Sequence, residues 1–457
     1  MTLRKVFVAA LFLVFTHGAS AQPTSVETLT TANGTQFYFA FMPNEERVSF
    51  DIIWKSDWLL DDQHNAMAPA VGTQLMLAGG AGDLDPAELQ SEFNDLVSDG
   101  SINAIADHVR GRLSVRSDQV QEAVAIANKV LVSPSLDDRW MQRIKDGIAD
   151  SVAKEKTHST YHGWDAVRRL LFGSSPTYRF ISNGGDLPVE AVTREDVLAW
   201  HKRTFVTSNA TITVAGQIGA EDAKLRVDEL FAGMPVGESA ATFDVKAKYL
   251  QKTIIVQNDD VEKTTLAYIA PLAPTSEGGE YEDIVGTHIL GGGEQSRLFQ
   301  AVRQQLRASY GFNAGLSAYS RTNRFVALSG EVDTQKLQEA RDTVKATYED
   351  FLQNGVTEEE ASALRTMFSD GLKVNLSHAG VVSYAITESV LDGLPVDRLL
   401  SLAKELETLN AVAVNTHLVN RFPKFDQFVE LIVTPTPIDQ PGACFVQSAD
   451  QIQDCLN

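Results

Sequence analysis

The chain has 457 residues, 44% of them hydrophobic, and a formal net charge of −21. This length allows two or more domains with large buried cores. The charge argues against nucleic acid and anionic membrane surfaces as partners, because both are themselves negative. It could favour basic peptides, although a high net charge commonly serves solubility.

The N-terminus has the pattern of a secretory signal peptide. Arg4 and Lys5 give a positive start, an apolar segment at 6–15 follows, and Ala19-Ser20-Ala21 provides a cleavage site. A membrane anchor is the alternative, but a spanning helix needs about 20 apolar residues and this segment is too short. We therefore expect residues 1–21 to be removed and the mature chain to have no membrane insertion.

The chain contains two cysteines, Cys444 and Cys455, both in the C-terminal tail. An exported compartment allows them to form a disulfide, which would fix the tail. The alternative is a metal site made by the two thiols, but no histidine lies near them in the sequence.

The order of predicted elements indicates a tandem duplication. We interpret 28–236 as an N-terminal domain, 237–250 as a linker, 251–437 as a C-terminal domain and 438–457 as a tail. The linker contains Gly, Ser, Ala and Lys and few bulky apolar residues. The predicted fold class is α+β, with two homologous domains that each pack helices on a mixed or antiparallel sheet. Two such domains can face each other as a clamshell around a cavity.

In the N-terminal half, apolar residues alternate along 48–54, which is typical of a strand with one buried face. Asp85-Pro86-Ala87-Glu88 has the pattern of a capping box, which marks a helix start. In chain order the half is predicted to contain strands at Gln36–Met42 and Arg47–Lys55, a helix at Met67–Leu77, a helix from Asp85 that stops at Gly100, a strand pair within Ile102–Arg116 and a helix from Asp118.

The C-terminal half repeats this order. Short sequence similarities support the repeat: Ile102-Asn103-Ala104 resembles Phe312-Asn313-Ala314. The predicted elements are strands at Thr253–Gln257 and Thr264–Ile269, helical segments at Tyr281–Leu290 and Ser296–Leu306, strands at Tyr310–Ala318 and Arg324–Val332, a helix from Thr334 and another from the capping box at Thr357.

One segment of the C-terminal half carries a specific motif. A glycine-rich turn at Gly291, Gly292 and Gly293 precedes Ser296-Arg297-Leu298-Phe299, then Arg303, and Tyr310 seven residues later. This motif resembles the second-domain motif of the pitrilysin/insulinase metallopeptidase family, and the order of elements is similar over nearly the whole mature chain. The turn is not a phosphate loop, because no Gly-Lys-Ser/Thr follows it.

The resemblance implies roles for these residues. In the family this Arg and Tyr reach towards the zinc site of the other domain or subunit, bind the substrate backbone and stabilise the oxyanion. It thus implies Arg303 and Tyr310 as catalytic residues acting in trans and Gly291–Gly293 as substrate-binding. The chain departs from the family at Arg307, where a Gly usually permits an unusual φ. Without the resemblance, Arg303 is more simply interpreted as a solvated helix residue and Tyr310 as a packed strand residue.

The family's zinc signature, His-x-x-Glu-His on the first long helix, is missing. Pro69, Gly72 and Thr73 stand at the three positions, and no histidine occurs between His64 and His108. Two histidines at i and i+4 are needed to bind zinc from one helical face, with the Glu activating water. The sequence therefore predicts no metal and no cofactor in this chain.

A second histidine pair has the same spacing but a different setting. His158 and His162 are separated by four positions, yet Tyr161 stands where a general base would be needed. A polar helix end is the simpler interpretation. His201, His288, His378 and His417 are isolated and are expected to be surface or core residues.

Taken together, these features resemble the non-catalytic subunit of a heterodimeric zinc peptidase of this family. That resemblance implies a pseudoenzyme that contributes to proteolysis only with a zinc-bearing partner subunit, an extended peptide as substrate, and a periplasmic location. Two alternatives stay open. One is a catalytically inert scaffold or peptide-binding protein of the same fold; the other is an autonomous zinc peptidase with unrecognised ligands.

Overall fold

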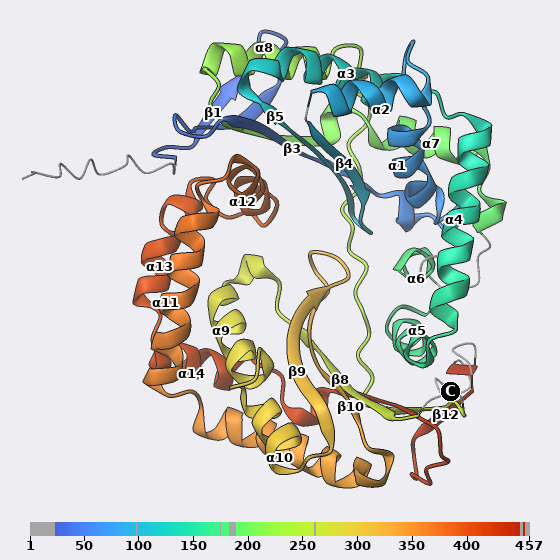
Figure 1. Cartoon of the computed structure of the whole chain (residues 1–457), viewed down its shortest axis with the longest axis vertical. Helices are drawn as coiled ribbons and strands as arrows, with labels where there is room; N and C mark the ends of the chain where they lie inside the picture. Colours follow the sequence, from blue (N-terminus) through green and yellow to red (C-terminus); the bar gives the residue numbers. More distant parts are fainter. Residues whose placement is uncertain are drawn as a thin grey trace, which may run out of the picture.

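Two six-stranded sheets form the frame of the protein (Figure 1). The computed structural model describes residues 23–96, 98–173, 175–181, 189–259, 262–447 and 451–452. The first sheet has the order β1-β2-β6-β3-β5-β4, with β1 (Glu27–Thr30), β2 (Gln36–Phe41), β3 (Arg47–Lys55), β4 (Asp99–Ala104), β5 (His108–Arg116) and β6 (Ala210–Gly216). The second has the order β12-β7-β11-β8-β10-β9, with β7 (Thr253–Gln257), β8 (Thr264–Leu272), β9 (Ser309–Ala318), β10 (Arg324–Val332), β11 (Val429–Thr434) and β12 (Cys444–Val446).

The two sheets repeat one topology. In each, a parallel pair, β2 with β6 and β7 with β11, adjoins an antiparallel series that ends at β4 or β9. They differ at the outer edge, where β1 precedes its neighbour and is antiparallel to it, while β12 comes from the tail and is parallel. The prediction of two homologous α+β halves, each a mixed sheet packed with helices, is confirmed.

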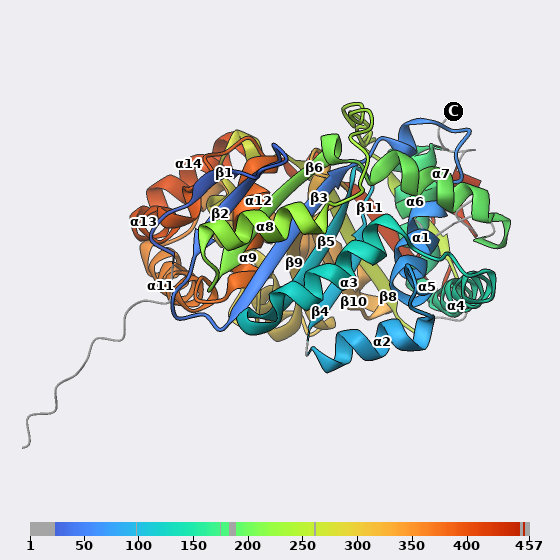
Figure 2. The ribbon, with the colours of Figure 1, turned by 90° about the horizontal axis from the view of Figure 1, so that it is seen from above.

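Helices cover the outer face of each sheet. The alternating residues of β3, from Val48 to Trp54, point into this layer and are buried. Figure 2 shows α3 and α8 lying across the first sheet. The first-half helices are α1 (Ala68–Ala78), α2 (Pro86–Asp95), α3 (Val120–Val132), α4 (Asp138–Lys156), α5 (Ser159–Phe172), α6 (Pro176–Ile181), α7 (Arg194–Thr204) and α8 (Ala220–Leu230). The second-half helices are α9 (Glu280–Gly291), α10 (Leu337–Asn354), α11 (Glu358–Asn375), α12 (Ala379–Leu391), α13 (Leu402–Thr408) and α14 (Ala411–Arg421).

The predicted capping boxes are present at the starts of α2 and α11. The Asp85 carboxylate accepts from the backbone N–H of Glu88, whose side chain accepts from Asp85 N–H in return. Thr357 and Glu360 form the same pair. The prediction that the first of these helices continues to Gly100 is wrong: α2 ends at Asp95, and β4 begins at Asp99.

Two helices pack on the sheet of the opposite half. On the inner face of the second sheet, α5 from the first half buries Ala166, Val167 and Leu170 against strands that include β7 and β11. In the reciprocal position, α12 from the second half lies against β3 and β6 of the first sheet (Figure 1). Each sheet therefore obtains part of its inner cover from the other half of the chain.

The segment that joins the two sheets contains no helix or strand between Phe231 and Lys252. It is held at both ends: Ala241 N–H donates to Asp57 of the first half, and Ala247 N–H donates to Asn323 of the second. The exact domain boundaries, and a closing movement of the halves as a clamshell, stay interpretations.

The predicted signal peptide at 1–21 lies outside the described residues, as does Cys455. Cys444 is buried on β12, and its pairing with Cys455 stays a prediction. Within the described part of the chain, no helix combines the length and apolar character that a membrane crossing requires.

Candidate functional site

Helix α1 carries the residues at the zinc-motif positions, and its packing leaves no space for a larger side chain at residue 72, the position of the Glu. Pro69, Gly72 and Thr73 are all buried. A Cβ added to Gly72 would lie 2.3 Å from Cζ3 of Trp200, a fully buried ring on α7. The Thr73 hydroxyl donates to the Ala70 carbonyl within the helix. The residues present therefore do not fit the zinc that the family resemblance implies at this helix.

The second histidine pair does not share a helical face. His158 is the N-cap of α5 and has an extended backbone, with φ −85° and ψ 128°. His162, one turn inside the helix, instead meets the ring of Tyr161 edge to face. Among the described residues, no group of three or more His, Cys, Asp or Glu side chains is placed to hold a metal ion.

The structure brings Arg303 and Tyr310 together. Arg303 lies on a π-helix, Phe299–Gln305, and Tyr310 is the second residue of β9. The Arg303 Cζ atom is 5.4 Å from the centre of the Tyr310 ring, a cation–π contact. Tyr310 is 75% exposed, so its phenol faces solvent and does not pack into the sheet.

Three backbone irregularities surround this pair. The π-helix is an uncommon local structure that is frequent at functional sites. Arg307 has φ +55°, a conformation that favours glycine. A β-bulge shifts the register so that Tyr310 and Gly311 lie opposite the single residue Glu331. Bulges of this kind re-aim a side chain, which accounts for the outward direction of Tyr310.

Neighbouring groups hold the irregular turn in place. Lys336 Nζ donates to the Leu306 carbonyl at 3.0 Å, and the Asp333 N–H donates to the Ala308 carbonyl at 2.7 Å. Arg307 adopts a positive φ that a Gly at this position would adopt without steric cost.

The glycine-rich turn has a packing role at two of its three positions. Gly291 ends α9 and is buried against β9, where an added Cβ would meet Ala314 N at 2.0 Å. At Gly292 an added Cβ would meet His288, whereas Gly293 has open space around it. A substrate-binding role for these glycines stays a prediction.

A pocket of about 780 Å³, the central pocket, lies between the two halves of the chain. Its walls come from β4, β5, α9, α12 and the β9–β10 turn. Arg321 in that turn pairs with Glu388 and Asp392 of α12, both at 2.7 Å, and Arg110 of β5 also pairs with Glu388. Tyr384 of α12 lies beneath the Arg110 guanidinium. Sequence reasoning missed these residues, because charges from separate elements give no local motif.

Burial changes the titration of the carboxyl groups around the central pocket. It raises the pKa of Asp392, an effect that Arg321 only partly offsets. It also raises the pKa of Asp51, which lies under Arg110 and Arg112. Arg303 and Tyr310 do not line this pocket.

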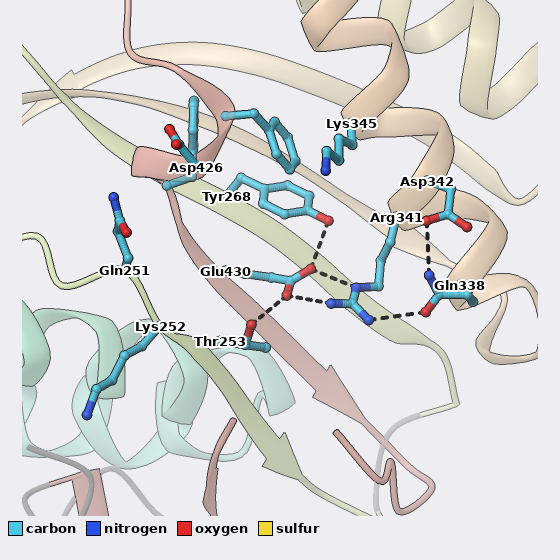
Figure 3. Close-up of a pocket in the computed structure, with 12 residues that line it drawn as sticks. Gln251, Lys252, Thr253, Tyr268, Gln338, Arg341, Asp342, Lys345, Asp426 and Glu430 are labelled. Carbon is cyan, nitrogen blue, oxygen red and sulfur yellow. Dashed lines mark hydrogen bonds and ion pairs between the residues drawn. The ribbon is translucent and has the colours of Figure 1, made fainter. Parts of the chain in front are cut away.

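A further pocket, of about 380 Å³, lies where α10 meets β7, β8 and β11 (Figure 3). Its central carboxylate, Glu430, accepts two hydrogen bonds from Arg341 at 2.8 Å, one from the Tyr268 hydroxyl and one from the Thr253 hydroxyl. Burial is the main cause that raises the pKa of Tyr268. Because the Glu430 carboxylate already accepts four hydrogen bonds, we interpret this network as structural.

Comparison with known proteins finds one matching family over part of the chain. Residues 191–368 match the family described as "Peptidase M16 inactive domain". An "Uncharacterized zinc protease" of Rickettsia felis is 24% identical over 234 residues, which cover 50% of this chain and 49% of that protein. A similar protein of Rickettsia bellii is 24% identical over 241 residues. The chain thus spans about half the length of the curated relatives it matches.

Solved structures show the same fold over most of the chain. The peptidase M16 inactive domain from Pseudomonas fluorescens superposes with a TM-score of 0.82 at 18% identity, covering 91% of this chain and 100% of that one. The first half of the periplasmic protease PqqL from Escherichia coli gives a TM-score of 0.67 at 13% identity, covering 95% and 94%. The chain therefore has the two-domain fold of these structures, and its residues 191–368 are similar to the M16 inactive domain, in agreement with the resemblance to the pitrilysin/insulinase family found in its sequence.

Proposed function

We propose that this protein is the non-catalytic subunit of a heterodimeric M16 peptidase, in which it supplies Arg303 and Tyr310 to an active site completed by a zinc-bearing partner. The observation that carries the proposal is the contrast between two sites. The zinc-motif helix of this chain is packed against Trp200, while Arg303 and Tyr310 stay together on an exposed surface. A pair of donors on an open surface suits an active site that a second chain completes.

The two side chains have complementary chemistry. A guanidinium offers donors in fixed directions to a carbonyl oxygen, and a phenol adds one more. Donors aimed at a developing oxyanion lower the barrier by about 2.7–4 kcal/mol each. In the proposed pair, zinc and the general base belong to the partner subunit, and this chain orients the peptide carbonyl and stabilises the charge that develops on its oxygen.

An extended peptide is the substrate that the sheet edges favour. Among the described strands, β4 and β9 are each paired on one side only. β9 presents Asn313, Gly315 and Ser317 as exposed residues, small enough to let another strand approach. A peptide added to a free edge gains backbone hydrogen bonds without a large hydrophobic pocket.

A mixing assay tests this proposal. The protein is combined with each zinc-bearing M16 protein from the same source, and cleavage of a fluorogenic peptide is measured. We expect activity only in one mixture, and we expect Arg303→Ala to lower kcat/KM of that mixture by roughly 100-fold. Arg139→Ala, at a 90% exposed arginine side chain on α4, is the matched control. Equal activity of the two variants would show that Arg303 has no catalytic role.

The second candidate is an inert scaffold or peptide-binding protein. The central pocket favours it, because both halves contribute to a cavity of about 780 Å³ that is lined in part by charged side chains and does not include the Arg303–Tyr310 pair. Purification of the native protein with its associated molecules separates the two: an M16 peptidase partner supports the heterodimer, while bound peptide without a peptidase supports the alternative.

We also propose that the protein is exported to a periplasm after removal of residues 1–21. The signal-like N-terminus supports export, and the periplasmic PqqL protease has a similar fold. N-terminal sequencing of the mature protein should begin at Gln22, and an intact Met1 in the native protein would contradict export by a cleaved signal.

A further inference from the structure

We propose that Lys263, together with Arg303 and Tyr310, forms a carboxylate-binding site that selects acidic peptides. Lys263 lies just before β8, and its Nζ atom is 4.1 Å from the centre of the Tyr310 ring. Arg303 approaches the same ring to 5.4 Å. One exposed phenol therefore contacts two cations that come from separate segments of the second half.

Among the residues that the structure describes, the two cations lack acidic partners. In the part of the chain that the structure describes, neither Lys263 nor Arg303 forms an ion pair or a side-chain hydrogen bond. Nearby cations are already used: Arg297 pairs with Glu360 at 2.9 Å, and Lys336 donates to the Leu306 carbonyl. In a chain with net charge −21, two neighbouring cations without a carboxylate partner stand out as available to an anionic ligand.

The local structure holds the site open. Lys263 and Arg303 are half-buried, which limits their freedom, while the β-bulge and the Arg307 turn direct Tyr310 outward. A cation–π contact at an exposed site is worth about 0.5–1 kcal/mol. A hydrogen bond between charged groups is stronger. A ligand carboxylate can therefore take Lys263 as its partner and also accept from the Tyr310 hydroxyl.

In the proposed site, the two cations bind different groups of the peptide. Arg303 is the donor to the peptide carbonyl in the proposed function, on which this inference rests for placing a peptide against Tyr310. Lys263 then receives the carboxylate of a nearby Asp or Glu side chain or of the peptide C-terminus. The chemistry shared by these sources is a single carboxylate next to an extended backbone.

Peptide titrations of the isolated protein test the site. The probes are an acetylated and amidated hexapeptide with one Glu, its Gln counterpart, and the Gln peptide with a free C-terminal carboxylate. Binding is followed by NMR with ¹³C-labelled tyrosine, and Tyr310→Phe identifies the Tyr310 resonance. We expect one or both carboxylate peptides to shift this resonance, with an affinity at least about tenfold higher than that of the neutral peptide. The more effective probe identifies the carboxylate source.

A lysine variant with a matched control separates this site from general charge attraction. Lys263→Ala should lower the affinity for the carboxylate peptides about tenfold and leave the affinity for the neutral peptide unchanged. Lys345→Ala, at an exposed lysine of α10, should change neither. Equal binding of all three peptides, no shift of Tyr310 with any peptide, or equal effects of the two lysine variants would overturn the proposal.

The outcome is independent of the partner subunit. Selective binding by the isolated chain supports the carboxylate site even if no mixture with an M16 peptidase gains activity. Conversely, an active mixture that depends on Arg303 but treats Glu and Gln peptides alike would support the proposed function and reject the role of Lys263.

Discussion

At the scale of single residues, Arg307 holds a backbone conformation that favours glycine. Its φ of +55° costs a non-glycine residue about 1–2 kcal/mol. The turn leads directly into Tyr310, so the contacts of Tyr310 with Lys263 and Arg303 depend on its path. The strain therefore lies next to the residues to which we assign function, as is common for strained backbone.

Arg307→Gly should relieve this strain. We expect it to raise the free energy of unfolding by up to about 1 kcal/mol, because the relief exceeds the entropy cost of a glycine in the unfolded chain. Chemical denaturation measures the change. Arg307→Ala keeps the strain and serves as the control, so an alanine variant as stable as the glycine variant would refute the strained turn.

The close packing at Gly72 opposes restoration of the zinc motif on α1. The triple change Pro69→His, Gly72→Glu and Thr73→His restores the letters of the family signature but places a side chain into the Trp200 ring. We expect the free energy of unfolding to fall by about 1–3 kcal/mol through overpacking.

Thermal denaturation and metal analysis check this expectation. Trp200→Ala should cost less stability in the triple variant than in the parent protein, because removing the ring frees the space at residue 72. A triple variant that keeps the parent stability and holds zinc stoichiometrically would show that α1 is not blocked.

At the scale of elements, Asp57 ties the linker to the first half. Its carboxylate accepts from Arg203 Nε at 3.1 Å and from the Ala241 N–H at 2.8 Å. Burial raises the pKa of Asp57, but these hydrogen bonds outweigh it, and the net pKa is lowered. A lowered folded-state pKa means that the stabilisation is present above the unfolded-state pKa of about 3.9 and is lost as the pH falls through the folded-state value.

Asp57→Asn should therefore lower the free energy of unfolding by about 1–3 kcal/mol at neutral pH. The difference from the parent protein should shrink as the pH falls below about 4. Urea denaturation across pH measures it. Asp118→Asn, at an exposed carboxyl whose pKa Arg116 lowers, should have a smaller effect because solvent screens that pair. A difference for Asp57→Asn that is independent of pH would contradict the charge-based role.

The two helices that pack on the sheet of the opposite half, α5 and α12, differ in the chemistry of their contacts. α5 meets the second sheet through an apolar cluster, and Gly163 allows close approach to Val433. The interface between α12 and the first sheet is partly polar. The hydroxyls of Ser383 and Ser49 form a hydrogen bond at 3.0 Å, and the Thr387 hydroxyl donates to the Thr213 hydroxyl at 2.8 Å. The equivalent contacts of the duplicated halves have thus diverged in sequence while their positions are kept.

At the scale of the whole molecule, each half depends on the other because α5 and α12 each pack on the sheet of the opposite half. A fragment of residues 23–236 would expose the apolar face of α5 and leave Ala40, Met42 and Ala215 without the cover of α12. We expect this fragment to bind a hydrophobic dye and to lack a cooperative thermal transition.

Coexpression of 23–236 with 237–457 should restore a cooperative transition, because each fragment then regains its missing helix. The comparison needs only calorimetry and dye fluorescence. A fragment that unfolds cooperatively on its own would show that the exchanged helices are dispensable for folding.

Much of the architecture could be predicted from the sequence because it has local causes. The alternation along β3 fixes which face is buried, and the capping boxes at Asp85 and Thr357 fix two helix starts. The family motif brought Arg303 and Tyr310 to attention, and the zinc positions could be read as empty of ligands. The end of α2 was misjudged, because Gly100 lies inside β4, where strand pairing with β5 decides the conformation.

The sequence by itself determined the duplicated α+β order, the absence of the zinc motif and the Arg–Tyr pair, since each is written within a short segment. Only the tertiary structure decided that α5 and α12 exchange sheets, that Trp200 fills the space beside Gly72, that charges from several elements meet in the central pocket, and that Lys263 joins Tyr310. These features depend on contacts between residues far apart in the chain, and the physical reason they escape a linear reading is that packing, rather than local propensity, selects them.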